Sequence, residues 1–157
     1  MTSKNLLEAL QAMEFTHGLE PEHLERLASM ATEASFSEGE ILFREGDMCD
    51  VVYLVREGQV AIRIHVPGRG RVNILTVGPG QLVGWSSLFA RRHMTATGCA
   101  VAATRAIAID ADKLRAACEE DHHLGHAVVW RVAGIIAERL KATRLQLLDM
   151  FASGPST

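Results

Sequence analysis

The glycines of this 157-residue chain are concentrated in its middle. Most of its 13 glycines lie between Gly39 and Gly84, where they separate short runs rich in β-branched residues. Turn signals at intervals of about 8–12 residues are typical of an all-β sandwich or barrel. One run, Gln59–Val66, alternates apolar and polar residues as a half-buried antiparallel strand does. We therefore expect residues 32–110 to form a β-barrel.

Helical patterns flank this β block on both sides. Two amphipathic stretches precede it, and the second begins at Pro21, a residue favoured in the first turn of a helix. After the block, Asp110 or Asp112 can cap a short helix. The stretch His122–Phe151 contains no proline and would span about 45 Å as a helix. The predicted order is helices in 1–31, the barrel in 32–110 and helices in 111–151, all within one domain, 1–157.

Composition and charge exclude several classes of protein. Hydrophobic residues make up 48% of the chain and charged residues 22%, close to the average of globular domains. The net charge of −3 lacks the basic excess expected of a nucleic-acid binder. No apolar run approaches the length of a membrane span, and three scattered cysteines (Cys49, Cys99 and Cys118) form no C-x-x-C pair. We expect a cytoplasmic protein that binds no membrane and, by itself, no nucleic acid.

The long C-terminal helix carries an apolar seam at alternating spacings of four and three residues, which is a heptad pattern. A second apolar row, Val128, Val132 and Ile135, lies beside the seam. One stripe can therefore pack on the β block while the other meets a partner helix. This pattern favours a homodimer over a single helix that lies on its own domain. The seam consists of Val129, Ala133, Ile136, Leu140, Thr143, Leu147 and Met150.

We find no catalytic pattern and no metal-binding pattern in the sequence. The histidines His122, His123 and His126 do not follow the H-E-x-x-H order and have no third ligand nearby, so a surface cluster is favoured over a zinc site. The chain also lacks the G-x-S-x-G, P-loop and G-x-G-x-x-G motifs. An enzyme is therefore the least favoured class of function, and we expect no catalytic residue and no resident metal.

Three clusters follow one another along the β block. They are Phe36-x-x-Gly39-Glu40-Ile41-Leu42-Phe43-x-Glu45-Gly46-Asp47, then Val52-Tyr53-Leu54-Val55-x-x-Gly58-x-Val60, then Val77-x-Pro79-Gly80-x-x-Val83-Gly84. Their order and spacing resemble the cyclic nucleotide-binding domain of the Crp/Fnr regulators and of cyclic-nucleotide-dependent kinases. The resemblance covers roughly Leu24 to Phe151. It implies an α+β, mainly β fold: a jelly-roll barrel with N-terminal helices and a long C-terminal helix that forms the dimer interface in Crp-like proteins.

The family's phosphate-binding cassette carries an acidic residue for the ribose 2′-OH and an arginine for the cyclic phosphate. In this chain the cassette falls at residues 80–96, with Trp85 at the acidic position and Met94 at the arginine position. Each lost charge-assisted contact is worth about 1.5–3 kcal/mol, so binding would weaken from micromolar towards millimolar. The ligand contacts that the resemblance implies are Gly84, Trp85, Ser86, Ser87, Leu88, Met94, Thr95 and Ala96.

Two features of the cassette leave alternatives open. Arg91, Arg92 or His93 could replace the missing charge, although a position in solvent at the loop tip is favoured. Trp85 could stack on a planar ligand, although filling the pocket is the commoner outcome for a tryptophan.

The resemblance implies a non-enzymatic regulatory module that senses a ligand, with cAMP or cGMP held weakly or with altered specificity. It would signal through its C-terminal helix and homodimer to a downstream protein. The alternative is a degenerate, ligand-free scaffold for dimerisation or protein docking. Crp-type regulators carry a helix-turn-helix module after the long helix, and this sequence stops short of one. We therefore expect a stand-alone domain that senses a ligand or docks a partner and binds no nucleic acid by itself; a truncated transcription factor that acts on DNA through a separate partner is less favoured.

Overall fold

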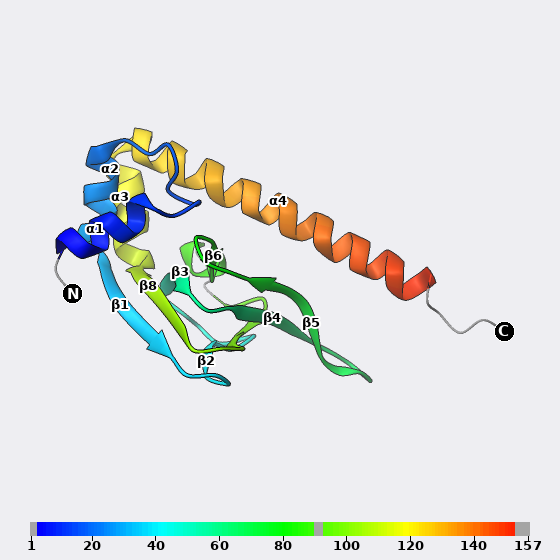
Figure 1. Ribbon diagram of the computed structural model, residues 1–157. Coiled ribbons are helices and arrows are strands. Elements are labelled where there is room, and N and C mark those ends of the chain that lie inside the picture. Colours follow the sequence, from blue (N-terminus) through cyan, green and yellow to red (C-terminus); the bar gives the residue numbers. More distant parts are fainter. Residues whose placement is uncertain (1–2, 90–92, 153–157) are drawn as a thin grey trace.

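A computed structural model of the chain describes residues 3–89 and 93–152. The helices are α1 (Ser3–Gln11), α2 (Pro21–Ser29), α3 (Ala111–Glu120) and α4 (His122–Ala152), with a short 3₁₀ helix, η1, at Trp85–Leu88. The strands are β1 (Ala31–Phe36), β2 (Ile41–Phe43), β3 (Val51–Glu57), β4 (Val60–Val66), β5 (Gly70–Val77), β6 (Leu82–Val83), β7 (Thr97–Ala100) and β8 (Thr104–Asp110). In Figure 1, α1, α2 and α3 gather at one end of the strands, while α4 runs along them and extends beyond that cluster.

The strands form two four-stranded antiparallel sheets, in the orders β1-β8-β3-β6 and β2-β7-β4-β5. The mainly β jelly-roll fold with flanking helices is therefore confirmed, but the closed barrel predicted for residues 32–110 is wrong. Among the described residues, no strand of one sheet joins a ladder of the other. The edge strands β2 and β6 contain only three and two residues, too few to carry a continuous ladder between the sheets. The sheets instead pack against each other through side chains.

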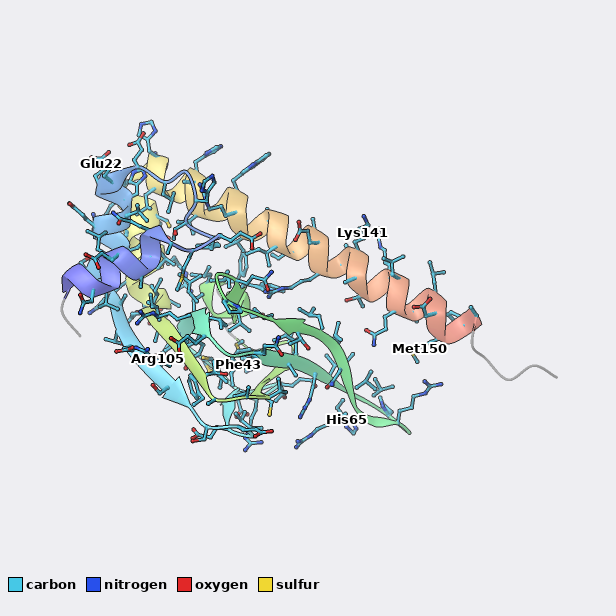
Figure 2. The ribbon with its side chains drawn as sticks, viewed as in Figure 1. Glu22, Phe43, His65, Arg105, Lys141 and Met150 are labelled. Atoms are coloured by element: carbon cyan, nitrogen blue, oxygen red, sulfur yellow. The ribbon has the colours of Figure 1, made fainter. Side chains whose placement is uncertain are left out.

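The inter-sheet core fills the space between the two sheets. Strand β3 contributes Val55 to it, and strand β4 contributes Val60 and Ile62, all of them buried. Phe43 of β2 also belongs to this core and is labelled among the strands in Figure 2. Burial of side chains of this size stabilises a fold by about 1.5–3 kcal/mol each. The inter-sheet core consists of Leu42, Phe43, Val55, Val60, Ile62, Val77, Val83, Met94 and Ala100.

The helical core lies on the other face of the first sheet. Val52 and Leu54 of β3 point into it and are fully buried, as is Ile107 of β8. They meet apolar side chains of α1, α2, α3 and the first half of α4. Period-two alternation along β3 thus sends neighbouring side chains into two different cores.

An aspartate caps the start of each of the helices α3 and α4. Asp110 accepts a hydrogen bond from the Lys113 backbone N–H at 2.9 Å, so Asp110, of the two predicted candidates, caps α3. Asp121 Oδ1 accepts the backbone N–H groups of Leu124 at 3.2 Å and His123 at 3.0 Å, which lower the pKa of that carboxyl. These caps satisfy N–H groups that a helix start leaves without partners.

Helix α4 has 31 residues, about 46 Å at 1.5 Å per residue. Its fully buried residues, Leu124, Gly125, Val128 and Val132, all lie in its first eleven positions. Beyond them the helix keeps a polar tie to the second sheet, because Gln146 Nε2 donates to the Asn73 carbonyl at 2.7 Å. None of the helices in the described ranges is long and apolar enough to cross a membrane.

Gly58 sits in the hairpin between β3 and β4 with a φ of +90°, a region that L side chains rarely adopt. A Cβ at this position would lie 2.6 Å from Thr104 Oγ1 and would also clash with the Ala103 carbonyl. Gly39 has a similar φ of +91°, but a Cβ there would point into open space, with no described atom beyond its chain neighbours within 4 Å. A comparison of Gly39 with Gly58 therefore separates the cost of the left-handed backbone from the cost of a steric clash.

We predict that Gly39→Ala lowers the free energy of unfolding by about 1 kcal/mol, the cost of the left-handed conformation alone. Gly58→Ala should lower it by about 3 kcal/mol or more, because the new methyl group also displaces the start of β8. Chemical denaturation of both variants measures the two losses. Equal losses would show that β8 yields to a methyl group at Gly58 without cost.

Candidate functional site

The cassette predicted at residues 80–96 links β5 to β7 and contains β6 and η1. Gly84 precedes η1 with a φ of +85°, and a Cβ there would lie 3.4 Å from the Phe43 ring. A larger residue at Gly84 would thus be both strained and crowded against the inter-sheet core. The glycine allows the chain to turn directly from β6 into η1.

The two serines of η1 have different surroundings. The Ser87 hydroxyl is fully buried, and its single proton is shared between the carbonyls of Val51 at 2.9 Å and Gly84 at 2.8 Å. The Ser86 hydroxyl lies 3.2 Å from that of Thr95, so this pair connects the two ends of the cassette. Thr95 is exposed and Ser86 is nearly buried. The accessible hydroxyl in this group is therefore that of Thr95, whereas Ser87 holds η1 against β3.

Met94, predicted to lie at the position of the family's arginine, is only 4% exposed and belongs to the inter-sheet core. Its backbone pairs with the loop after β2, because Met94 N donates to the Asp47 carbonyl at 2.9 Å and Gly46 N donates to the Met94 carbonyl at 2.8 Å. The thioether adapts well to an irregular apolar space of this kind. The second half of the cassette is thus held by apolar burial and two backbone hydrogen bonds.

Trp85, predicted to lie at the position of the family's acidic residue, is partly buried and packs against the helical core. Its ring meets that of Phe89 edge-to-face, with centroids 5.9 Å apart and planes at 80°. Trp85 therefore lies on the side of the helices, whereas Met94 lies between the sheets. Ala96 packs on the inter-sheet core and Leu88 on the helical core, both partly buried.

The basic residues at the cassette tip are described only in part. His93 is exposed, and its Nδ1 lies 3.0 Å from the Gly46 carbonyl. This position agrees with the favoured placement of the tip in solvent. Arg91 and Arg92, the other two candidates to replace the missing charge, lie outside the described residues.

Arg115 of α3 contacts the cassette directly, although no sequence pattern singles it out. Its guanidinium donates to the carbonyls of Leu88 and Ser87, each at 3.0 Å, and also lies 3.3 Å from Asp112. These carbonyls end η1, where an arginine can satisfy acceptors that the helix leaves free. Arg115 thus ties the cassette to the helical bundle, a long-range contact that residue spacing cannot reveal.

The seam predicted on α4 mostly faces solvent. Val129 is 61% exposed, and Leu140 and Leu147 are about half exposed, at 49% and 52%. The neighbouring row packs inward instead, with Val128 and Val132 buried in the helical core. The two stripes are not fully separated, because Ile136 of the seam also packs against the helical core. Of the remaining seam residues, Ala133 and Thr143 are exposed, and Ile136 and Met150 are partly buried.

One group of potential metal ligands escapes the sequence analysis. Glu20, Glu22 and His23 bring ligand atoms within 4.8 Å of one another at the start of α2. Both glutamates are exposed, and the buried His23 already faces Asp121, with Nε2 and Oδ2 3.5 Å apart. This geometry is explained by packing of α2 against the start of α4. The predicted histidine cluster at His122, by contrast, is exposed.

Comparison with known proteins identifies relatives of the chain. The family model described as "Cyclic nucleotide-binding domain" matches residues 33–121. The CRP-like cAMP-activated global transcriptional regulator of Mycobacterium tuberculosis is 28% identical over 134 residues, 85% of this chain and 58% of that protein. The cyclic AMP receptor protein of Thermus thermophilus is 30% identical over 83% of this chain and 59% of that protein. The chain therefore spans less than two thirds of the length of these curated relatives.

A solved structure supports the fold by shape. A cyclic nucleotide-binding domain from Methylobacillus flagellatus superposes with a TM-score of 0.79 at 22% identity, covering 94% of this chain and 83% of that chain. At this identity the likeness concerns the fold alone. It agrees with the arrangement of sheets, cassette and long helix in Figure 1.

The burial of Met94 predicts that the chain no longer tolerates the family's arginine there. Met94→Arg should lower the free energy of unfolding by about 3–5 kcal/mol, because it places an unpaired charge in an apolar core. Thr95→Arg, one residue further along but exposed, should change it by less than about 0.5 kcal/mol. Urea denaturation of both variants provides the comparison. A small loss at Met94→Arg would mean that the side chain can turn outward into a ligand pocket.

Proposed function

The chain belongs to the cyclic nucleotide-binding domain family, and we propose that it acts as a non-enzymatic regulatory module that binds cAMP or cGMP weakly or with altered specificity. The observation that carries this proposal is the burial of Met94 in the inter-sheet core, where the family's arginine would face the cyclic phosphate. The relatives' names support the ligand class, since one is cAMP-activated and another is a cyclic AMP receptor.

The residual polar groups of the cassette support weak binding. Without an arginine or an acidic residue in their usual places, the accessible hydroxyl of Thr95 and backbone N–H groups remain as partners for a phosphate. Two lost charge-assisted contacts at about 1.5–3 kcal/mol each would weaken binding by at least a hundredfold. This reasoning leads to dissociation constants near the millimolar range.

The alternative function is a ligand-free scaffold, and the surroundings of Ser87 favour it. The Ser87 hydroxyl is buried and makes two hydrogen bonds within the protein, so it offers nothing to a ligand without rearrangement. Trp85 likewise packs on the helical core. A cassette held in this way can keep its shape without any nucleotide.

We further propose that α4 pairs with α4 of a second copy. Val129, Leu140 and Leu147 form one exposed stripe on this helix, and a helix that leaves such a stripe uncovered gains stability by burying it against a partner. The stripe follows the heptad spacing that two identical helices can share. Of the nine large apolar side chains that are exposed among the described residues, seven lie on α4: Val129, Trp130, Leu140, Leu145, Leu147, Leu148 and Phe151.

A route from the cassette to this helix supports a signalling role. Arg115 joins the end of η1 to α3, and Trp85 packs on the same core as the first half of α4. A ligand that moves η1 would therefore displace α3 and α4 together, and a downstream protein could detect the shift. In a scaffold the same contacts would serve only to stiffen the domain.

Titration with cyclic nucleotides tests the ligand. By calorimetry we expect dissociation constants for cAMP and cGMP near the millimolar range, and saturable binding below about 100 μM would contradict the weakened cassette. The indole N–H signal of Trp85 in an NMR spectrum, assigned with Trp85→Phe, should shift as cAMP is added to about 10 mM, roughly ten times the expected dissociation constant. An unchanged Trp85 signal at this concentration would favour the ligand-free scaffold.

Light scattering tests the dimer. The wild-type chain should give about twice its 17.1 kDa mass, and Leu147→Lys should reduce this to the mass of one chain by placing a charge in the seam. Leu145→Lys is a matched control, because Leu145 is 53% exposed against 52% for Leu147 but lies about 160° away around the helix. A monomeric wild-type protein, or equal effects of both variants, would refute pairing through this seam.

A further inference from the structure

A cavity that forms a second candidate site lies between α4, the connection from β5 to β6 and the loop after α1. Its volume is about 600 Å³, within the range of small-molecule sites. Apolar walls come from Phe15, Leu82, Trp130 and Ile135. Gly80, Gln81 and Leu82, at the start of the cassette, line this cavity, but none of the described residues of 84–96, where the predicted ligand contacts lie, does so.

Arg139 of α4 is the unusual group in this cavity. It is partly buried, and burial lowers its pKa to about 10. A guanidinium has five N–H donors, and among the described residues this one makes a single hydrogen bond, to the Leu82 carbonyl. Within the same part of the chain, no carboxylate oxygen lies within 4.0 Å of it. Buried charges in proteins are normally paired, so the surroundings of Arg139 favour the binding of an anion.

The other described charged groups that line the cavity do not use the remaining N–H donors of Arg139. Arg131 donates to the carbonyls of Ala127 at 3.1 Å and His17 at 2.6 Å, and so holds the loop after α1 against α4. Glu14 and Glu138 also line the cavity, but both are exposed. The carboxylates therefore lie towards the rim and the guanidinium of Arg139 towards the inside.

We propose that this cavity binds a small organic anion, with its acidic group on Arg139 and a flat apolar body against the aromatic and aliphatic walls. An acidic group there would engage the unused N–H donors in charge-assisted hydrogen bonds. The apolar walls would remove the body of the ligand from water, and Trp130, 73% exposed at present, would be partly covered. Such a ligand would contact α4, the β5–β6 connection and the loop after α1 at once.

Naphthylacetate and its uncharged isostere naphthylacetamide are suitable probes, because they differ only in the acidic group. The two tryptophans report the place of binding in one NMR spectrum: Trp130 lines the cavity, whereas Trp85 lies in the cassette. With naphthylacetate we expect a saturable shift of the Trp130 indole N–H signal and little change at Trp85. With naphthylacetamide binding should be at least tenfold weaker.

Variants on α4 separate the role of Arg139 from a general effect of charge. Arg139→Leu should weaken naphthylacetate binding at least tenfold and leave naphthylacetamide binding unchanged. Arg144→Leu is the matched control, because Arg144 is exposed on the same helix and does not line the cavity. Equal affinity for both probes, equal effects of the two variants, a shift confined to Trp85, or no saturable shift up to about 5 mM would each overturn the proposal.

Discussion

Strand β3 is buried on both faces, and the positions of the sheets, the cassette and the helices all depend on it. Val52 and Leu54 enter the helical core, and Val55 enters the inter-sheet core. The backbone at the start of the strand serves as a second anchor. The Val51 carbonyl accepts the Ser87 hydroxyl, and the Asp50 carbonyl accepts the backbone N–H of Ala111 at 2.8 Å. The same short segment therefore fixes η1 and the first turn of α3 relative to both sheets.

The two substituted cassette positions follow from this double-core arrangement. Met94 is buried between the sheets, and Trp85 packs against the helices, so each adds an apolar contact at a position where the resemblance predicts a charge. A charged residue at either position would need a partner of opposite charge, such as a group of a bound nucleotide, because an unpaired charge is costly near an apolar core. Apolar residues remove that need. Such a cassette needs no ligand to balance a charge, and this supports both proposed functions, weak binding and a scaffold role.

The sequence predicts features that depend on neighbouring residues and misses those that depend on distant ones. Alternation in Gln59–Val66 and the Asp110 cap identify β4 and the start of α3 because both patterns are local. Strand β1 has no such pattern: half of its residues are exposed, and it is held by its ladder to β8 and by the ion pair of Glu33 with Arg105. Whether the two sheets close into a barrel, and what Arg115 contacts, likewise depend on residues far apart in the chain, which local periodicity does not encode.

The two stripes of α4 connect the proposed functions physically. Beyond its buried first turns, the helix makes few polar contacts with the sheets in the described ranges. Among them, Arg139 donates to the carbonyl of Leu82 in β6 of the first sheet, and Gln146 donates to the carbonyl of Asn73 in β5 of the second sheet. An anion in the second cavity would share the Arg139 guanidinium with Leu82 and add contacts on the inner stripe. Lys141, labelled in Figure 2, lies on the side of the helix that points away from the sheets. A ligand that changes the tilt of α4 on its inner stripe must also reposition the seam, because one rigid helix carries both. Pairing of two copies and binding of the anion would therefore be energetically coupled, each changing the affinity of the other by the same factor.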